Sequence, residues 1–168
     1  SVAPSSDSAF NIASAASRSQ VTVTRPANTT AYTAGDVIGG VITFTGMGVA
    51  ASMQMLTCVD LRIDIAAIPS GMSSLRLHFY SVTPPSAYAD NAVWDLPSGD
   101  RSAYIGYIDL GTPVDLGSTL FCQADNVNKQ MKLGTGETAI YAYLVTSGGF
   151  TPAANSEVYV PTLRAVAL

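Results

Sequence analysis

The chain contains a single histidine, His78, so any histidine-dependent catalysis must use that residue. A Ser-His-Asp triad and histidine-based acid–base catalysis would both place it beside a nucleophile or a reacting proton. His78 alternates in phase with Arg76 and Tyr80, a pattern typical of the exposed side of a strand. We therefore expect His78 to be an ordinary exposed residue without a catalytic role.

The residues that could bind metals do not have the spacing of a metal site. Zinc takes three or four Cys or His ligands, whereas this chain offers one His and two distant cysteines, Cys58 and Cys122. Stretches 90–91 and 125–128 are rich in oxygen ligands, but they lack the alternation and fixed glycine of a calcium loop. Residues of these types are common in turns. We predict no metal and no cofactor.

The acidic and glycine-rich stretches give no specific signal for catalysis. A glycosidase needs two carboxyl groups that converge in a cleft, but among ten aspartates a pair can always be drawn, so their spacing is uninformative. The stretch 134–136 (GTG) lacks the lysine and the strand-to-helix context of a phosphate-binding loop, and it reads more simply as a hairpin turn. We predict that the chain is not an enzyme.

Composition limits the classes of partner. The net charge is −4 with only eight basic residues, so a basic groove for nucleic acid is not expected. No stretch is long and apolar enough to cross a membrane, and the N-terminus lacks the basic segment and apolar core of a secretory signal. Two distant cysteines do not make a disulfide scaffold, so we expect unpaired thiols and folding in a reducing cytoplasm.

The surface of a free monomer would carry unusually few charges. Only 12% of the residues are charged and 48% are hydrophobic, about half the usual charged fraction of a soluble domain. Such a surface suggests a protein that neighbouring subunits cover.

The elements that must carry these residues are β-strands. Glutamate and lysine, which normally cover exposed helices, are scarce, whereas Thr, Ser, Gly, Val and Pro are plentiful. Alternation is clearest over 55–65, and Gly39 and Gly40 indicate a bulge or a close backbone approach. The expected strands begin near residue 20 and continue at 37–45, 55–65, 74–82, 103–110, 118–124, 139–146 and 158–167. The sequence predicts an all-β fold, an antiparallel two-sheet sandwich or jelly roll over residues 21–168.

Two segments fall outside this pattern. Residues 1–20, rich in Ser and Ala, are expected to form an extended N-terminal arm that either binds a partner through Phe10 and Ile12 or has no role. Residues 83–102 form a long loop, with one helical turn expected around 87–94. Its aromatic side chains could stack on a sugar, pack in the core or anchor a subunit contact. The candidate interface residues are Phe10, Ile12, Arg18, Arg25, Tyr32, Tyr88 and Trp94.

Three stretches resemble a family of small structural proteins of tailed bacteriophages and prophages. They are TRPANTTAYTAGDVIGG (24–40), LRLHFYSVTPPSAYADNAVWDLPSGDRSAYIGYIDLG (75–111) and the closing VYVPTLRAVAL. The resemblance covers well over half of the chain and implies a virion role, with no enzyme activity and no cofactor. In physical terms the first stretch is a strand end, a loop and a turn, with Arg25 expected to bond to a nearby carboxylate or carbonyl.

These observations lead to one main expectation and two alternatives. The main expectation is a capsid decoration, or cement, protein: a homotrimer on the capsid surface of the virion, made in the host bacterial cytoplasm and bound to the major capsid protein. One alternative is a tail, fibre or baseplate module that recognises a host-surface glycan through the aromatic loop. The other is a lectin or hydrolase unrelated to any virus.

Overall fold

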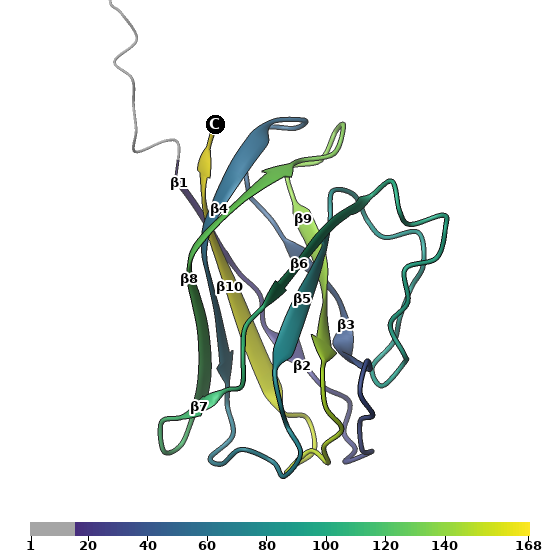
Figure 1. The fold of residues 1–168 in the computed structure, drawn as a ribbon, viewed down its shortest axis with the longest axis vertical. Helices are drawn as coiled ribbons and strands as arrows, with labels where there is room; N and C mark the ends of the chain where they lie inside the picture. Colours follow the sequence, from purple (N-terminus) through teal and green to yellow (C-terminus); the bar gives the residue numbers. More distant parts are fainter. Residues whose placement is uncertain (1–15) are drawn as a thin grey trace, which may run out of the picture.

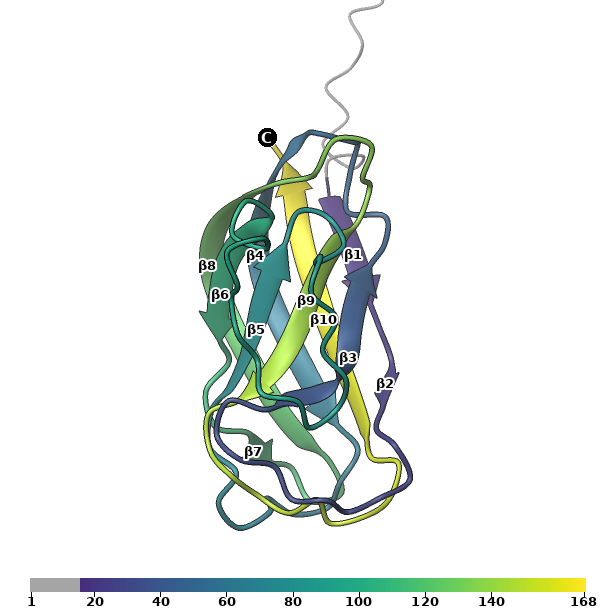
Figure 2. The same ribbon diagram turned by 90° about the vertical axis from the view of Figure 1, so that its right-hand side faces the viewer.

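The computed structural model describes residues 16–168. In this part of the chain there are ten β-strands and no helix, and the strands form two antiparallel sheets packed face to face (Figures 1 and 2). The strands are β1 (Ala16–Gln20), β2 (Val23–Thr24), β3 (Val37–Phe44), β4 (Met53–Ile63), β5 (Leu75–Tyr80), β6 (Tyr104–Asp109), β7 (Val114–Asp115), β8 (Leu120–Lys132), β9 (Ile140–Thr146) and β10 (Val158–Ala167).

The strand order is that of a jelly roll. Sheet 1 has the order β1-β10-β4-β8-β7, with β2 also paired to β10, and sheet 2 has the order β3-β9-β5-β6. Apart from the β1–β2, β5–β6 and β7–β8 connections, the chain changes sheet between successive strands, as in a double Greek key. The predicted all-β sandwich is confirmed.

The core lies between the two sheets and follows the alternation seen in the sequence. Along β4, Val59, Leu61 and Ile63 point inward with no exposed surface, whereas Arg62 is exposed. Burying this stripe against the opposite sheet is the main driving force for folding. The side chains that complete the centre of the core are Ile38, Ile42, Phe44, Leu75, Leu77, Phe79, Leu120, Ile140, Leu144, Tyr159 and Leu163.

The irregularity expected at Gly39 and Gly40 is present in β3. The pairing of β3 with β9 shifts between Ile38 and Ile42, and Gly39 has a φ of 81°. A Cβ atom at Gly39 would lie 2.3 Å from Cγ1 of Val23, so the backbone of β3 approaches β2 too closely for a side chain.

The sandwich begins earlier than residue 21. Ala16–Gln20, assigned from sequence to the arm, forms β1 and pairs with β10 in register from Ala16 with Val166 to Gln20 with Thr162. The arm expectation therefore applies to residues 1–15, which lie outside the described residues together with Phe10 and Ile12.

The expected helical turn around residues 87–94 is wrong. This part of the 83–102 loop instead runs along the free edge of β3, where the N–H of Val37 donates to the carbonyl of Ala92 and the N–H of Asn91 donates to the carbonyl of Val37. Asn91 has a φ of 65°, which a helix does not allow. The loop's backbone groups thus bond to a strand, and the loop covers the outer face of sheet 2 (Figure 2).

Candidate functional site

Arg25 and Tyr32, two of the predicted interface residues, come together in a buried cluster. The Arg25 side chain has no exposed surface, its Nε donates to the hydroxyl of Tyr32, and its Cζ lies 4.7 Å from the centre of the Tyr32 ring. The guanidinium lies 3.8 Å from the carboxylate of Asp90 and 3.8 Å from that of Glu157. The expected bond between Arg25 and a carboxylate is confirmed as two ion pairs.

The two carboxylates of this cluster also bind the surrounding backbone. Asp90 accepts from the hydroxyl of Tyr32 at 2.6 Å and from the N–H of Gly39 at 2.7 Å. Glu157 accepts from the N–H groups of Ala153 and Ala154. Burial raises the pKa of Tyr32, and the nearby Asp90 carboxylate raises it further.

This arrangement, here called the Arg25 clamp (Arg25, Tyr32, Asp90 and Glu157), joins three regions of the chain: the connection between β2 and β3, the 83–102 loop, and the residue before β10. Its two carboxylates resemble an acid–base pair in type, but their side chains are only 8% and 1% exposed. Because a substrate could not reach them, the clamp is suited to holding the fold and not to catalysis.

Tyr88 and Trp94 form part of a second apolar layer outside sheet 2. Tyr88 packs edge-on against Tyr143, and the Nε1 of Trp94 donates to the hydroxyl of Tyr80 at 3.1 Å. Both rings come from the 83–102 loop, and Tyr80 and Tyr143 project outward from β5 and β9. These two residues, expected as interface candidates, therefore first serve to hold the loop on the sheet.

His78 lies beneath this layer, so the expectation that it is exposed is wrong. Its side chain is on the outer side of β5, as its parity indicates, but the Trp94 ring lies 3.8 Å away, centre to centre, and the residue is 6% exposed. Burial, together with the nearby Arg76 charge, lowers the pKa of His78 to about 4. The His78 ring is therefore neutral at pH 7. It forms a hydrogen bond with the hydroxyl of Tyr104 at 3.0 Å, and otherwise packs against the neighbouring rings.

A hollow of about 370 Å³ opens at the edge of this layer. Trp94 and His78 contribute rings to its wall, and Arg76, Thr146 and Ser147 contribute polar groups. A ring beside hydrogen-bonding groups is a combination that can bind a small polar ligand.

Arg18 lies on the outer face of sheet 1, which no loop covers. Rows of side chains cross this face, and in one of them Arg18 stands opposite Arg164, Arg164 opposite Cys58, and Cys58 opposite Asp125. A shallow hollow of about 220 Å³ lies among them, with Arg18, Arg62 and Arg164 at its wall. Here the sequence-predicted residue lies on an accessible surface.

Cys58 belongs to the same face and is half-buried, and both Cys58 and Cys122 are free thiols, as predicted. The Sγ of Cys58 lies 3.3 Å from the carboxylate of Asp60 and 3.3 Å from that of Asp125, so its proton can bond to either. Burial and these acceptors raise the pKa of the Cys58 thiol to about 11, which leaves little reactive thiolate at neutral pH.

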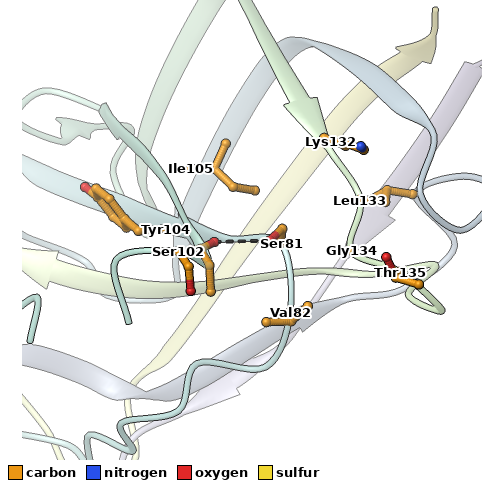
Figure 3. A pocket seen from close by; sticks show the side chains of 10 residues that line it. Ser81, Val82, Ser102, Tyr104, Ile105, Lys132, Leu133, Gly134 and Thr135 are labelled. Atoms are coloured by element: carbon orange, nitrogen blue, oxygen red, sulfur yellow. Dashed lines mark hydrogen bonds between the residues drawn. The ribbon is translucent and has the colours of Figure 1, made fainter. Parts of the chain in front are cut away.

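A further hollow, of about 510 Å³, was not anticipated from sequence (Figure 3). This β6–β8 groove lies where the start of β6 meets the end of β8 and the turn that follows it. Its lining residues are Ser81, Val82, Ser102, Ala103, Tyr104, Ile105, Lys132, Leu133, Gly134 and Thr135. No local sequence signal could have found it, because strands of different sheets, far apart in the chain, form its two sides.

Among the described residues 16–168, no group of three or more His, Cys, Asp or Glu side chains is placed to hold a metal ion. The same residues include no helix long and apolar enough to cross a membrane.

No family model matches the chain, and no curated protein matches it. Solved structures of viral capsids are similar to it at low identity. The Ralstonia phage GP4 capsid is 16% identical over 90% of this chain and 82% of that chain, with a TM-score of 0.42. The cyanophage Pam1 capsid asymmetric unit is 12% identical over 91% and 84%, with a TM-score of 0.38. The Israeli acute paralysis virus particle is 14% identical over 99% and 82%, with a TM-score of 0.32.

Proposed function

We propose that this chain is a bacteriophage capsid decoration protein, a jelly roll that binds the assembled head as a homotrimer and stabilises contacts between major capsid subunits. One observation carries the proposal: the residues of the phage-like stretches maintain structure. Arg25, Tyr32 and Asp90 lie in the buried clamp, and Trp94 and Tyr80 lie in the layer that holds the loop. Side chains used in this way favour a structural protein over an enzyme.

The outer face of sheet 1 is the docking surface that best fits this role. The other face is partly covered by the chain's own 83–102 loop, which packs on Tyr80 and Tyr143 and leaves Arg76 exposed. The face of sheet 1 presents Arg18, Arg62 and Arg164 close to Asp60 and Asp125, so it can form charged hydrogen bonds with a polar partner surface. Interfaces of this kind form between proteins that fold separately and then associate.

The mechanism would be thermodynamic. A protein that binds only the assembled shell shifts the equilibrium toward that shell by mass action, so the shell withstands heat and internal pressure better. The N-terminal arm, residues 1–15, would extend across a neighbouring subunit and bury Phe10 and Ile12.

The test uses heads of the encoding phage that lack this protein. Purified chain is added, and we expect it to co-sediment with the heads, to reach saturation at a fixed number of copies, and to raise their melting temperature. A chain without residues 1–15, which keeps β1 intact, should be retained less well. Heads that neither bind the chain nor gain thermal stability would contradict the proposal.

A second candidate function follows from the hollow beside Trp94. Its ring wall and the polar groups of Arg76 and Ser147 would suit a sugar, as in a tail or fibre module that recognises a host-surface glycan. Trp94→Ala would also loosen the 83–102 loop, so Arg76→Ala is the cleaner variant for a glycan array. Two results together would favour this function: the chain binds a glycan and Arg76→Ala abolishes that binding, and phage heads do not retain the chain.

A further inference from the structure

Two strand edges lie open on the same side of the sandwich. The strand β6 is the last of sheet 2 and pairs only with β5. In sheet 1, β8 pairs with β4 along its length, but β7 covers its other edge only at Leu120 and Phe121. A strand edge without a partner is a ready template for an added extended segment.

The β6–β8 groove lies between these edges and has an apolar floor with a polar rim. Val82 and Ile105 provide the accessible apolar surface, and Ser102 and Thr135 lie exposed at the rim (Figure 3). The floor can accept apolar side chains from one side of an extended segment, while the rim bonds to its backbone.

Charged side chains of both signs border this groove: Lys132 lines it, and Glu137 lies beside Gly134 in the turn that closes it. The chain's only two lysines, Lys129 and Lys132, both belong to the end of β8. The Nζ of Lys129 lies over Gly106 of β6, where an added Cβ would come within 2.8 Å of it. With charges of both signs at its border and apolar side chains between them, the groove favours a segment that carries few charges of its own.

Residues 1–15 of the chain have this chemistry. Their only charged side chain is Asp7. Phe10 and Ile12 are two residues apart, so in an extended segment both point to the same side, and the residues beside them are small or polar. This is the pattern that an apolar floor between two strand edges requires.

The position of β1 allows the segment to come from a second copy. Ala16 pairs with Val166, the N–H of Leu168 donates to the carbonyl of Met53, and Met53 pairs with Lys132. The start of β1 thus lies at the same end of the sandwich as the end of β8 (Figure 1), which lines the groove, while β10 and β4 separate β1 from β8 in sheet 1. Copies placed side by side bring the start of one β1 next to the groove of the following copy.

We infer that the β6–β8 groove receives residues 1–15 of a second copy of this chain, with Phe10 and Ile12 on its apolar floor, so that head-to-tail copies close into a ring. This rests on the self-association part of the proposed function. Fifteen extended residues span up to about 50 Å, enough to cross the junction between neighbours. A head-to-tail interface that closes is the kind that builds cyclic trimers.

Disulfide trapping tests the inference. One chain carries Asn11→Cys and a second carries Thr135→Cys, both with Cys58→Ser, and the mixture is oxidised without denaturant. We expect a cross-linked pair that contains one chain of each type. Thr151→Cys, at an exposed position in the connection between β9 and β10, is the matched control and should give no cross-link. Absence of the Thr135 cross-link would overturn the inference, as would an intramolecular bond within a chain that carries both cysteines.

A second measurement concerns affinity. Phe10→Ser with Ile12→Ser should weaken self-association about 100-fold, because two apolar side chains lose their burial. Val2→Ser, an apolar arm residue outside the pair, should have little effect; equal effects of the two variants would contradict the inference. If the chain binds to heads but the Asn11–Thr135 cross-link does not form, the inference is refuted and the decoration function stands. If the cross-linked rings form but do not bind to heads, the decoration function is refuted and the inference stands.

Discussion

The chain's own 83–102 loop covers the part of the outer face of sheet 2 around Tyr80 and Tyr143, whereas no loop among residues 16–168 packs in this way on the outer face of sheet 1. On the covered face, rings meet rings: Tyr80 packs edge-on against Tyr143, and Trp94 lies against His78. On the open face, charged side chains pair with each other, as Arg62 does with Asp64. In both sheets, side chains along a strand alternate between the core side and the outer side.

The difference between the faces shows where stability and binding are expected to reside. Burial of large rings contributes several kcal/mol per residue, whereas exposed ion pairs contribute little to folding. Substitutions on the covered face should therefore act on stability, and substitutions on the open face should act on association. The four predictions that follow test this division.

The largest effect is expected for Tyr80→Ala on the covered face. Tyr80 has no exposed surface and accepts the Nε1 hydrogen bond of Trp94, so its removal leaves a cavity and an unpaired donor. We expect the free energy of unfolding to fall by about 3–5 kcal/mol, measured by urea titration. Tyr80→Phe, which keeps the ring, should cost about 1–3 kcal/mol. A loss below about 1 kcal/mol for Tyr80→Ala would show that the layer adds nothing to the fold.

Stability should also depend on pH through His78. The pKa of this ring is lowered to about 4 in the folded chain by burial, from 6.5 for a solvated histidine. The unfolded chain therefore binds the proton first, and the stability present above pH 6.5 is lost as the pH falls toward 4. Between pH 7 and pH 5 we expect a loss of about 2 kcal/mol. His78→Asn should remove most of this change in stability with pH. If the variant shows the same change, other titrating groups cause it.

The covered face also shows what alternation in a sequence can and cannot predict. It placed Arg76, His78 and Tyr80 on the outer side of β5 correctly, because side-chain direction is a local property of a strand. It failed on exposure, because the cover comes from a loop that follows the strand and folds back over it. Parity is encoded locally, whereas burial depends on tertiary packing.

The same distinction explains the other outcomes. The expectation that Arg25 bonds to a carboxylate needed only its charge, but its partners, Asp90 and Glu157, are distant in sequence and could not have been named. The strand expected over 118–124 continues as β8 to Lys132. Alternation is lost there because Asn126 and Asn128 adopt positive φ within the strand. The β6–β8 groove had no signal, since it exists only where two sheets meet.

On the open face, Cys58 should be a slow nucleophile despite its partial exposure. Burial and its Asp125 and Asp60 neighbours raise the pKa of its thiol to about 11, so at pH 8 iodoacetamide should modify it about 100-fold more slowly than an ordinary cysteine. Asp125→Ala, which removes one acceptor of the thiol proton, should increase the rate. Peptide mass spectrometry separates Cys58 from the buried Cys122. Modification of Cys58 at the rate seen in urea-unfolded chain would contradict the role of this environment.

The smallest effect on folding is expected for Arg62→Ala at the centre of the open face. The Arg62 and Asp64 side chains pair at 2.8 Å but are 48% and 44% exposed, so solvent screens their attraction and the loss of stability should stay below about 0.5 kcal/mol. If this face docks on the capsid, the same substitution should weaken retention on heads, since it removes a charged donor from the contact. Arg101→Ala, an exposed arginine on the 83–102 loop, is the matched control. Equal retention of both variants would move the docking surface away from sheet 1, while a large loss of stability for Arg62→Ala would remove the contrast between the two faces.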